Sequence, residues 1–309
     1  MNTKANTQAN QNGDDAAKLP RKPQRIRRWM IRLVLLPCIV YCGILGLLVA
    51  NETSLVYPGS RYPKGNWEPE EFSYEEIAFE SADGTKLVGW FLPRYLQTQD
   101  LETSEQHSKQ HSLLFCHGNA ENVAESSQWY GENYRRSLNA DVFVFDYRGY
   151  GKSEGTPFEE GVLQDAEAAL NLLCEKTGLQ PQDVVIVGSS IGGGPAVYLA
   201  SKHGCKVLIL RRTFTSISGV AAQQFPWLPV RLLMRNQYPS ETRIKSFDGP
   251  LFQSHGQADT LIPIEMGKTL FEAAPTTNKK FYSVPNMGHL DPLPQEYWGE
   301  MAAFVNAVE

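Results

Sequence analysis

The stretch Gly-Ser-Ser-Ile-Gly at residues 188–192 follows directly on the apolar run 184–187, and it constrains the fold more than any other part of the chain. A Gly-x-Ser-x-Gly pattern between a buried strand and a helix is typical of a nucleophile elbow. In that turn, side chains two residues to either side of the serine would clash. Only Ser190 has glycine at both of those positions, and Ser189 does not. The pattern therefore predicts a strand–turn–helix unit with Ser190 at its tip.

Short apolar runs alternate with amphipathic segments from residue 77 onward. Such alternation predicts an α/β fold with a mostly parallel eight-stranded sheet and helices on both faces. We expect strands over 77–80, 86–92, 113–116, 142–145, 184–187, 207–210, 251–254 and 281–284. We expect helices over 121–138, 159–176, after the elbow, over 263–274 and over 296–308. Ligands of such sheets bind at the carboxyl ends of the strands, which is where catalytic groups are to be sought.

Residues 33–50 carry no charge and are mostly apolar, and residues 29–31 extend the run upstream. A stretch of this length suits one transmembrane helix over residues 29–50. A cleaved signal peptide is disfavoured because the stretch is long and residues 48–50 make a poor small-x-small cleavage site. A buried core helix is disfavoured because the segment has no polar face. We therefore predict an uncleaved membrane anchor.

Basic side chains concentrate before this anchor. Residues 1–32 hold eight Lys and Arg residues against two Asp residues, whereas the 309-residue chain has a formal net charge of −5, so the rest of the chain is acidic. The positive-inside rule then predicts a cytoplasmic N-terminus and an extracytoplasmic body, periplasmic if the source is bacterial. Residues 1–28 are predicted to be a disordered basic tail. An acidic body without an aromatic-studded basic patch argues against nucleic-acid binding.

A serine nucleophile needs a general base, usually a histidine that a carboxylate holds in the right tautomer. His289 follows the last predicted strand on a glycine-containing loop at the carboxyl edge of the sheet, downstream of Ser190. We predict it as the base. The other five histidines fall in a polar loop, at a helix end or before a glycine where the ring more often braces a turn: His107, His111, His203, His117 and His255.

Asp259 lies shortly after a predicted strand and just before a helix that Pro263 opens. An Asp in such a place often caps a turn or a helix. Here it is also the predicted acid of a triad. Asp291 is a weaker rival because it lies only two residues from His289.

Two backbone N–H groups are needed to stabilise the oxyanion. Ile191 should supply one, since it follows the nucleophile at the N-terminus of a helix whose dipole favours negative charge. Asn119 should supply the other, from the loop after the strand that ends at Cys116. Gly118 in that loop lacks the Cβ that would keep the backbone away from a substrate.

Together these motifs resemble those of serine hydrolases of the α/β-hydrolase superfamily. The resemblance is to the branch of membrane-anchored hydrolases that includes eukaryotic protein depalmitoylases and bacterial serine-peptidase-like relatives. The matching segments are HGNAEN at 117–122, DYRGYGKSEG at 146–155, GSSIGG at 188–193, HGQAD at 255–259 and Gly288-His289. The order Ser190, Asp259, His289 is the order of this family's triad. The resemblance implies an α/β-hydrolase domain over residues 73–309, after a linker over 51–72.

Two segments depart from the family pattern or leave alternatives open. Relatives usually follow the strand after the elbow helix with an acidic or small polar residue, Ser or Ala, and then Pro, but here Arg211 and Arg212 stand. Their guanidinium groups either favour an acidic substrate or pair with surface carboxylates. Residues 213–247 form either a small cap over the pocket or a single covering helix, with an apolar wall in both cases. The polar loop 97–111 is longer than the fold needs.

We expect a membrane-anchored serine hydrolase that cleaves carboxylic ester or thioester bonds of small-molecule or acylated substrates. The alternatives are a serine peptidase of the same fold and a catalytically silent α/β-hydrolase that serves as a binding module. The intact triad argues against the silent module, and the lack of a propeller-sized domain argues against the peptidase. Asp146 is expected to organise the loop that follows it rather than to react. The sequence leaves the physiological substrate and the oligomeric state open.

No cofactor or metal site is predicted. The run Gly192-Gly193-Gly194 lacks the Lys-Ser/Thr of a phosphate-binding P-loop. Two of the five cysteines lie in the apolar span, and the other three do not make a disulfide framework.

Overall fold

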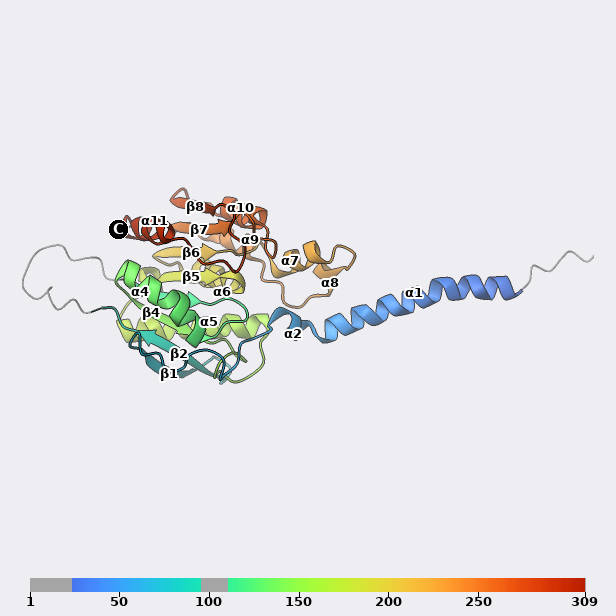
Figure 1. Ribbon diagram of the computed structural model, residues 1–309, viewed down its shortest axis with the longest axis horizontal. Helices are drawn as coiled ribbons and strands as arrows, with labels where there is room; N and C mark the ends of the chain where they lie inside the picture. The colour runs from blue at the N-terminus through green and yellow to red at the C-terminus, as the bar shows by residue number, and fades with distance from the viewer. Residues whose placement is uncertain (1–23, 96–110, 309) are drawn as a thin grey trace, which may run out of the picture. The chain divides into compact units, whose positions relative to one another are not determined.

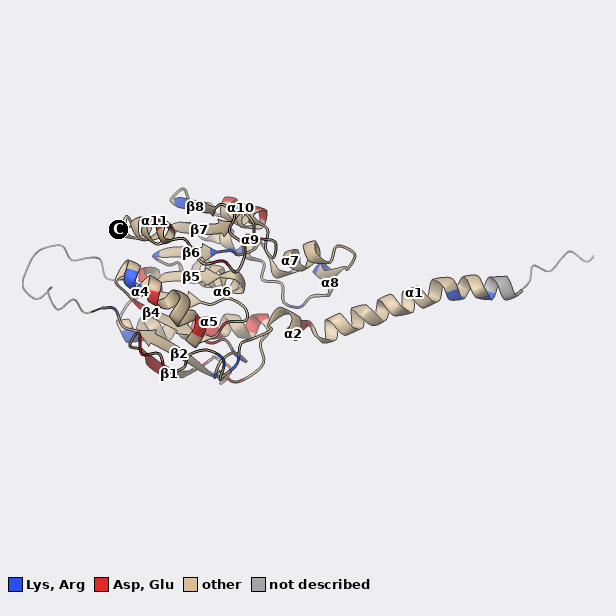
Figure 2. Cartoon of the chain, viewed as in Figure 1, with Lys and Arg blue, Asp and Glu red and all other residues tan. Residues whose placement is uncertain are grey.

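The computed structural model describes residues 24–95 and 111–308. They form two compact units, one that ends at Leu48 and one that starts at Val49. The first unit consists of most of helix α1 (Gln24–Ala50), whose segment Arg28–Ala50 has a mean hydropathy of 2.6 and is long and apolar enough to cross a membrane. Its described charged side chains, Arg28 and Arg32, lie near its start (Figure 2). Such a helix fits a membrane anchor or a signal sequence.

Helix α1 begins inside the segment predicted as a disordered tail. Residues 24–28 are helical, and the rest of that predicted tail lies outside the described residues. The predicted span over residues 29–50 coincides with the remainder of the helix.

An eight-stranded sheet forms the centre of the second unit (Figure 1). Its spatial order is β1-β2-β4-β3-β5-β6-β7-β8. The strands are β1 (Glu75–Glu80), β2 (Lys86–Leu92), β3 (His111–Cys116), β4 (Ala140–Phe145), β5 (Val185–Ser189), β6 (Val207–Arg211), β7 (Leu251–Gly256) and β8 (Lys279–Val284). Strands β1, β2 and β4 pair antiparallel, and all pairs from β4 to β8 are parallel. The predicted mostly parallel sheet of eight strands is confirmed.

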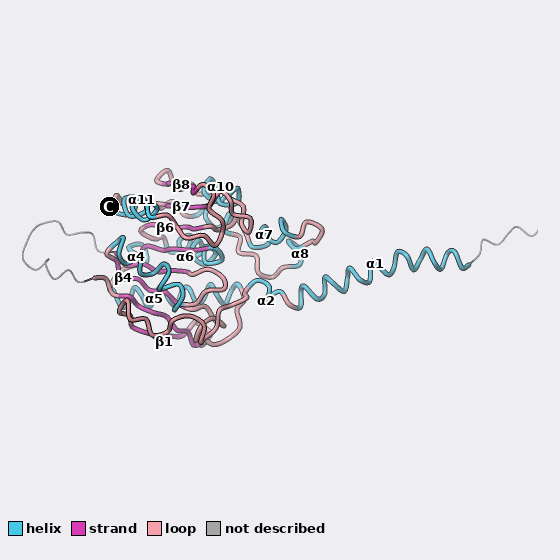
Figure 3. The backbone as a smooth tube through the Cα atoms, viewed as in Figure 1, coloured by secondary structure: helices cyan, strands magenta, loops and turns pink. Residues whose placement is uncertain are grey.

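The central strands are apolar throughout because helices cover both faces of the sheet. In β3, Leu114 and Cys116 belong to the core shared with α5 (Glu159–Thr177), α6 (Gly193–His203) and α10 (Ile264–Ala273). Leu113 and Phe115 belong to the core shared with α4 (Glu132–Leu138) and α11 (Gln295–Asn306). Alternate side chains thus point to opposite cores, which is why no polar face appears in the strand. Figure 3 shows how strands and helices alternate along the chain.

Two elements differ from their predicted form. The single helix predicted over 121–138 is α3 (Val123–Ser126), the π-helical turn η1 (Ser127–Gly131) and α4 in succession. His111 is not part of a polar loop, because it opens β3, is buried, and places Nε2 2.9 Å from Asn306 Oδ1. Residues 96–110 of that predicted loop lie outside the described part of the chain.

Residues 213–247 contain several short helices and not one covering helix. These are α7 (Ile217–Gln224), α8 (Val230–Leu233), α9 (Ser240–Arg243) and the 3-10 turn η4 (Ile244–Ser246). Helices α7 and α8 project from the sheet in Figure 1, and we call residues 213–247 the cap. The remaining elements are α2 (Glu52–Val56) and the 3-10 turns η2 (Pro181–Asp183) and η3 (Ser190–Gly192).

Candidate active site

The chain turns sharply where β5 ends and η3 begins. Ser190, the first residue of η3, has a φ of 54°, in the left-handed region that side chains rarely occupy. A Cβ on Gly188 would lie 2.6 Å from the carbonyl oxygen of Gly192, and a Cβ on Gly192 would lie 2.1 Å from that of Cys116. Both glycines are therefore required, the second because the elbow packs directly on the end of β3.

The structure brings together the three residues expected to form a triad. Ser190 Oγ lies 3.0 Å from His289 Nε2, and His289 Nδ1 lies 2.7 Å from Asp259 Oδ2. Ser190 and His289 are half-buried, whereas Asp259 is 6% exposed. The other oxygen of Asp259 accepts the backbone N–H groups of Leu261 at 3.0 Å and Ile262 at 2.9 Å. Both oxygens of the carboxylate thus have fixed partners, so the carboxylate has one orientation.

Burial alone would raise the pKa of Asp259. Hydrogen bonds from His255, His289 and the Ile262 N–H outweigh burial and hold this pKa well below its usual value. Asp259 is therefore ionised at neutral pH and favours the His289 tautomer with a proton on Nδ1, which leaves Nε2 to accept the serine proton.

His255 is a partner of the acid that its sequence position did not reveal. Its Nε2 lies 2.7 Å from the Ile262 carbonyl oxygen and 3.3 Å from Asp259 Oδ2. The ring braces the turn after β7, as predicted for a histidine before a glycine, and it also contacts the carboxylate. The contact with Asp259 could not be predicted from the sequence, because it forms only when the turn after β7 brings Asp259 and Ile262 back to His255.

Two backbone contacts hold the loop of the acid against the loop of the histidine. A Cβ on Gly256 would lie 2.1 Å from the Met287 carbonyl oxygen, and the Ala258 N–H donates to the same oxygen at 3.0 Å. Asn286, with a φ of 56°, turns the chain after β8. The distance between Asp259 and His289 is thus fixed by the main chain on both sides.

Arg212 holds the histidine loop from another direction. Its guanidinium nitrogens Nη1 and Nη2 donate to the carbonyl oxygens of His289 and Asp291, and its backbone N–H donates to the Ser254 carbonyl at 2.9 Å. Its side chain is 3% exposed and its φ is 48°. The expectation that Arg212 pairs with a surface carboxylate is wrong, because its partners are main-chain carbonyls of the loop that carries His289.

Arg211 is also buried, on the face of the sheet covered by α4 and α11. Its Cζ lies 3.9 Å from the centroid of the Tyr130 ring, a cation–π contact. Among the described residues, none of its three guanidinium nitrogens has a hydrogen-bond partner. The expectation that Arg211 pairs with a surface carboxylate is therefore wrong as well. Arg211 is the last residue of β6, and its side chain is buried against the Tyr130 ring.

The loop expected to supply an oxyanion donor is fixed by side-chain contacts. Asn119 Nδ2 donates to the Val56 carbonyl at 2.6 Å, and Asn119 Oδ1 accepts from the Tyr150 hydroxyl at 2.6 Å. His117 Nδ1 lies 2.7 Å from the Gly118 carbonyl oxygen, and burial lowers the pKa of His117 to about 4, so the ring is neutral. Because Gly192 packs on the Cys116 and His117 carbonyls, the Asn119 loop lies beside the elbow that contains Ile191.

Asp146 contacts the loop that follows it, as expected, since the Ser153 hydroxyl donates to its carbonyl at 2.9 Å. It also contacts the chain just after the Asn119 loop. Its Oδ1 accepts the Val123 N–H at 2.9 Å, and a Cβ on Gly151 would lie 1.8 Å from its Oδ2. Burial raises the pKa of Asp146 well above its usual value.

The segment predicted as a linker contacts both the oxyanion loop and the cap. Besides the Val56 carbonyl on Asn119, Glu52 Oε1 accepts the backbone N–H groups of Arg235 and Asn236, each at 2.8 Å. Glu159 Oε2 accepts the next two N–H groups along the chain, at 2.6 and 2.9 Å. Two carboxylates thus bind four consecutive amides, 235–238, at the base of the cap.

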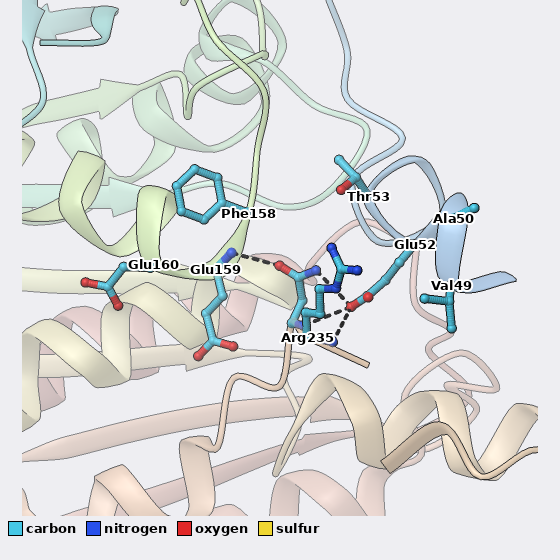
Figure 4. Close-up of a pocket in the computed structure, with 9 residues that line it drawn as sticks. Val49, Ala50, Glu52, Thr53, Phe158, Glu159, Glu160 and Arg235 are labelled. Atoms are coloured by element: carbon cyan, nitrogen blue, oxygen red, sulfur yellow. Dashed lines mark hydrogen bonds between the residues drawn. The ribbon is translucent and has the colours of Figure 1, made fainter. Parts of the chain in front are cut away.

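A pocket of about 520 Å³ lies beside these carboxylates (Figure 4). Its lining residues are Val49, Ala50, Glu52, Thr53, Phe158, Glu159, Glu160, Arg235 and Asn236. No member of the triad lines it. No group of three or more His, Cys, Asp and Glu residues suited to a metal occurs in the described part of the chain.

Comparisons with known proteins agree with this fold. The sequence model described as alpha/beta hydrolase fold matches residues 111–233. An uncharacterized protein of Mycobacterium tuberculosis is 31% identical over 260 residues, covering 84% of this chain and 88% of the relative. Protein bem46 of Schizosaccharomyces pombe is 33% identical over 258 residues, covering 80% and 83%. An esterase of Pyrococcus furiosus superposes with a TM-score of 0.63 at 20% identity, covering 82% of this chain and 98% of that one.

A mostly parallel eight-stranded sheet with a serine at a strand–helix elbow defines an α/β hydrolase. The chain belongs to the α/β-hydrolase family.

Proposed function

We propose that this α/β hydrolase is a membrane-anchored serine hydrolase that cleaves carboxylic ester or thioester bonds. The observation that carries the proposal is the pair of contacts from Asp259 through His289 to Ser190, at 2.7 and 3.0 Å. Ser190 and His289 are 99 positions apart in sequence, and His289 and Asp259 are 30 apart. Their contacts run from acid to base to nucleophile, as serine catalysis needs.

In this mechanism His289 Nε2 takes the proton of the Ser190 hydroxyl as Oγ attacks the substrate carbonyl. The backbone N–H groups of Asn119 and Ile191 stabilise the resulting oxyanion. His289 then protonates the leaving oxygen or sulfur, and the acyl group stays on Ser190. A water that gives its proton to His289 attacks the acyl-enzyme. His289 returns this proton to Ser190 Oγ as the bond between Oγ and the acyl carbon breaks, which releases the acid and restores the serine.

Helix α1 acts in this proposal as an uncleaved anchor, with the N-terminus in the cytoplasm and the hydrolase domain outside. The basic residues that precede the helix support this orientation, and its apolar length up to residue 50 supports a membrane span. The apolar side chains of the cap favour esters and thioesters of hydrophobic acids as substrates.

Replacing Ser190 tests the proposal directly. Ser190→Ala should lower kcat for short p-nitrophenyl esters by at least about 10⁴-fold, because the acyl-enzyme can no longer form. Ser189→Ala is the matched control, since Ser189 lies next to the elbow but lacks flanking glycines, and it should keep activity within about threefold. Turnover by Ser190→Ala at the level of the parent chain would contradict the assignment.

A further inference from the structure

Large apolar side chains are exposed at one end of the cap. Leu232 on α8 is 87% exposed, and Phe225 at the end of α7 is 44% exposed, with Trp227 and Leu233 between or beside them at 56% and 37%. We call residues 225–233 the cap tip. Exposed apolar residues gathered within nine positions usually mark a surface that another apolar phase covers.

The charge around the cap tip differs from that of the rest of the body. Residues 212–240 contain no Asp or Glu, although the chain as a whole carries a net charge of −5. Arg231 and Arg235 are exposed on either side of Leu232 and Leu233. In the fold, Arg235 lines the same pocket as Glu52, Glu159 and Glu160, so Arg231 is the arginine of the cap tip itself. Exposed apolar residues beside an arginine are the composition of segments that lie in the interface of anionic bilayers.

The contacts of Glu52 place this surface near the end of α1. Helix α1 ends at Ala50, and two Cα steps of about 3.8 Å lead to Glu52. The Glu52 carboxylate accepts the Arg235 and Asn236 N–H groups at 2.8 Å, and two further steps lead back from Arg235 to Leu233. Leu233 therefore lies within about 25 Å of Ala50, whatever direction α1 takes.

Buried hydrogen bonds hold α2 against the base of the cap. Glu52 is 7% exposed, and Asn236 Nδ2 donates to it at 2.9 Å. The Tyr57 hydroxyl donates to Asn236 Oδ1 at 2.9 Å and lies 2.9 Å from the Tyr238 hydroxyl. The residues just after the anchor and the base of the cap are thus joined by a buried polar network.

We infer that the cap tip docks into the interfacial layer of the bilayer that α1 crosses, with Arg231 at anionic headgroups. The inference rests on the proposed anchor and deepens the proposed function. The cap adjoins the nucleophile, since Thr213 Oγ1 donates to the Ser190 carbonyl at 2.8 Å and Gln224 Nε2 donates to the Leu261 carbonyl at 3.5 Å, beyond Asp259. Docking lets long acyl chains reach Ser190 from the membrane, so the substrate class is membrane-resident acyl esters or thioesters.

The location of the cap tip is measured without substrate. The full chain is reconstituted in phosphatidylcholine–phosphatidylglycerol vesicles whose acyl chains carry bromine, which quenches nearby tryptophans. Fluorescence quenching should be greater in the parent than in Trp227→Phe, and the difference reports the quenching of Trp227. When Phe225→Glu/Leu232→Glu is present in both proteins, this difference should disappear. If the chain migrates with the vesicles in a flotation gradient but no difference in quenching appears, docking is overturned and the anchor is retained. If the chain does not migrate with the vesicles, both the anchor and the docking are overturned.

The consequence for catalysis is measured with two esters in the same vesicles. In Phe225→Glu/Leu232→Glu, kcat/KM for a membrane-dispersed hexadecanoyl ester should fall at least about tenfold, while that for a soluble acetyl ester stays within about twofold. Trp129→Glu is the matched control, because Trp129 is 50% exposed on η1 and does not belong to the cap, and this variant should leave both values unchanged. Equal values for parent and variant with the hexadecanoyl ester overturn the inference. A loss with both esters overturns it as well.

Discussion

Arg212 shows how much of this site depends on one side chain outside the triad. A guanidinium presents several N–H donors in a fixed fork, so it binds the carbonyls of His289 and Asp291 at once, which a lysine ammonium does less well. The loop it holds carries His289 to within 3.0 Å of Ser190. In the proposed mechanism Arg212 is therefore a positioning residue that acts through His289.

Replacing Arg212 should change kcat more than KM. Arg212→Ala should lower kcat for a short ester about 10²-fold, since a displacement of about 1 Å in the reacting groups has an effect of that size. Arg212→Lys should recover part of the loss. Arg231→Ala, which removes an exposed arginine, should leave turnover of the same soluble ester unchanged. Steady-state kinetics beside thermal unfolding curves separate this effect from loss of fold, and a kcat equal to that of the parent in Arg212→Ala would rule out the positioning role.

Residue patterns predicted Ser190, Asp259 and His289 because each follows an apolar strand in a fixed order. The partners of these residues did not show in the pattern. His255 reaches Asp259 through a turn of the backbone, and Arg212 reaches main-chain carbonyls, which leave no trace in the identity of the residues that carry them.

At the scale of elements, α2 is the clearest departure from the sequence prediction. A segment with Pro and Gly after an apolar span is typical of a linker, yet Glu52 and Val56 bind residues 183 and 63 positions away in the chain. Such contacts depend on where the chain returns after β3 and within the cap, which local composition does not encode. The strands were predictable because their two-sided burial leaves uninterrupted apolar runs.

Glu52 should contribute measurably to the stability of the body. Glu52→Ala leaves three N–H donors without their buried acceptor and should lower the free energy of unfolding by about 2–3 kcal/mol. Glu52→Gln keeps an acceptor oxygen in place and should cost less than half of that. Denaturant unfolding of the full chain in detergent measures both variants, with exposed Glu160→Gln, beside the same pocket, as control. Equal stability of Glu52→Ala and the control would contradict a structural role for the contact.

At the scale of the whole molecule, the central sheet was predicted more completely than the cap and its contact with α2. The alternation of strands and helices predicted the eight-stranded sheet, and family membership agrees with this fold. The composition of residues 213–247 indicated an apolar wall and left a small cap and a single covering helix both open. The several short helices were not predicted, because Pro226, Pro229 and Pro239 interrupt the periodicity that would mark each one. The link between α2 and the cap arises only when the chain is folded.

The central claim is that Ser190 is the nucleophile of a serine hydrolase. The most direct test is to react the full chain in vesicles with a fluorophosphonate and to identify the modified residue by mass spectrometry of the digested protein. The account predicts one phosphonate adduct, on Ser190, and no adduct on the same peptide in His289→Ala. An adduct on Ser189 or on another serine, or ester turnover that continues with Ser190 unmodified, would contradict it.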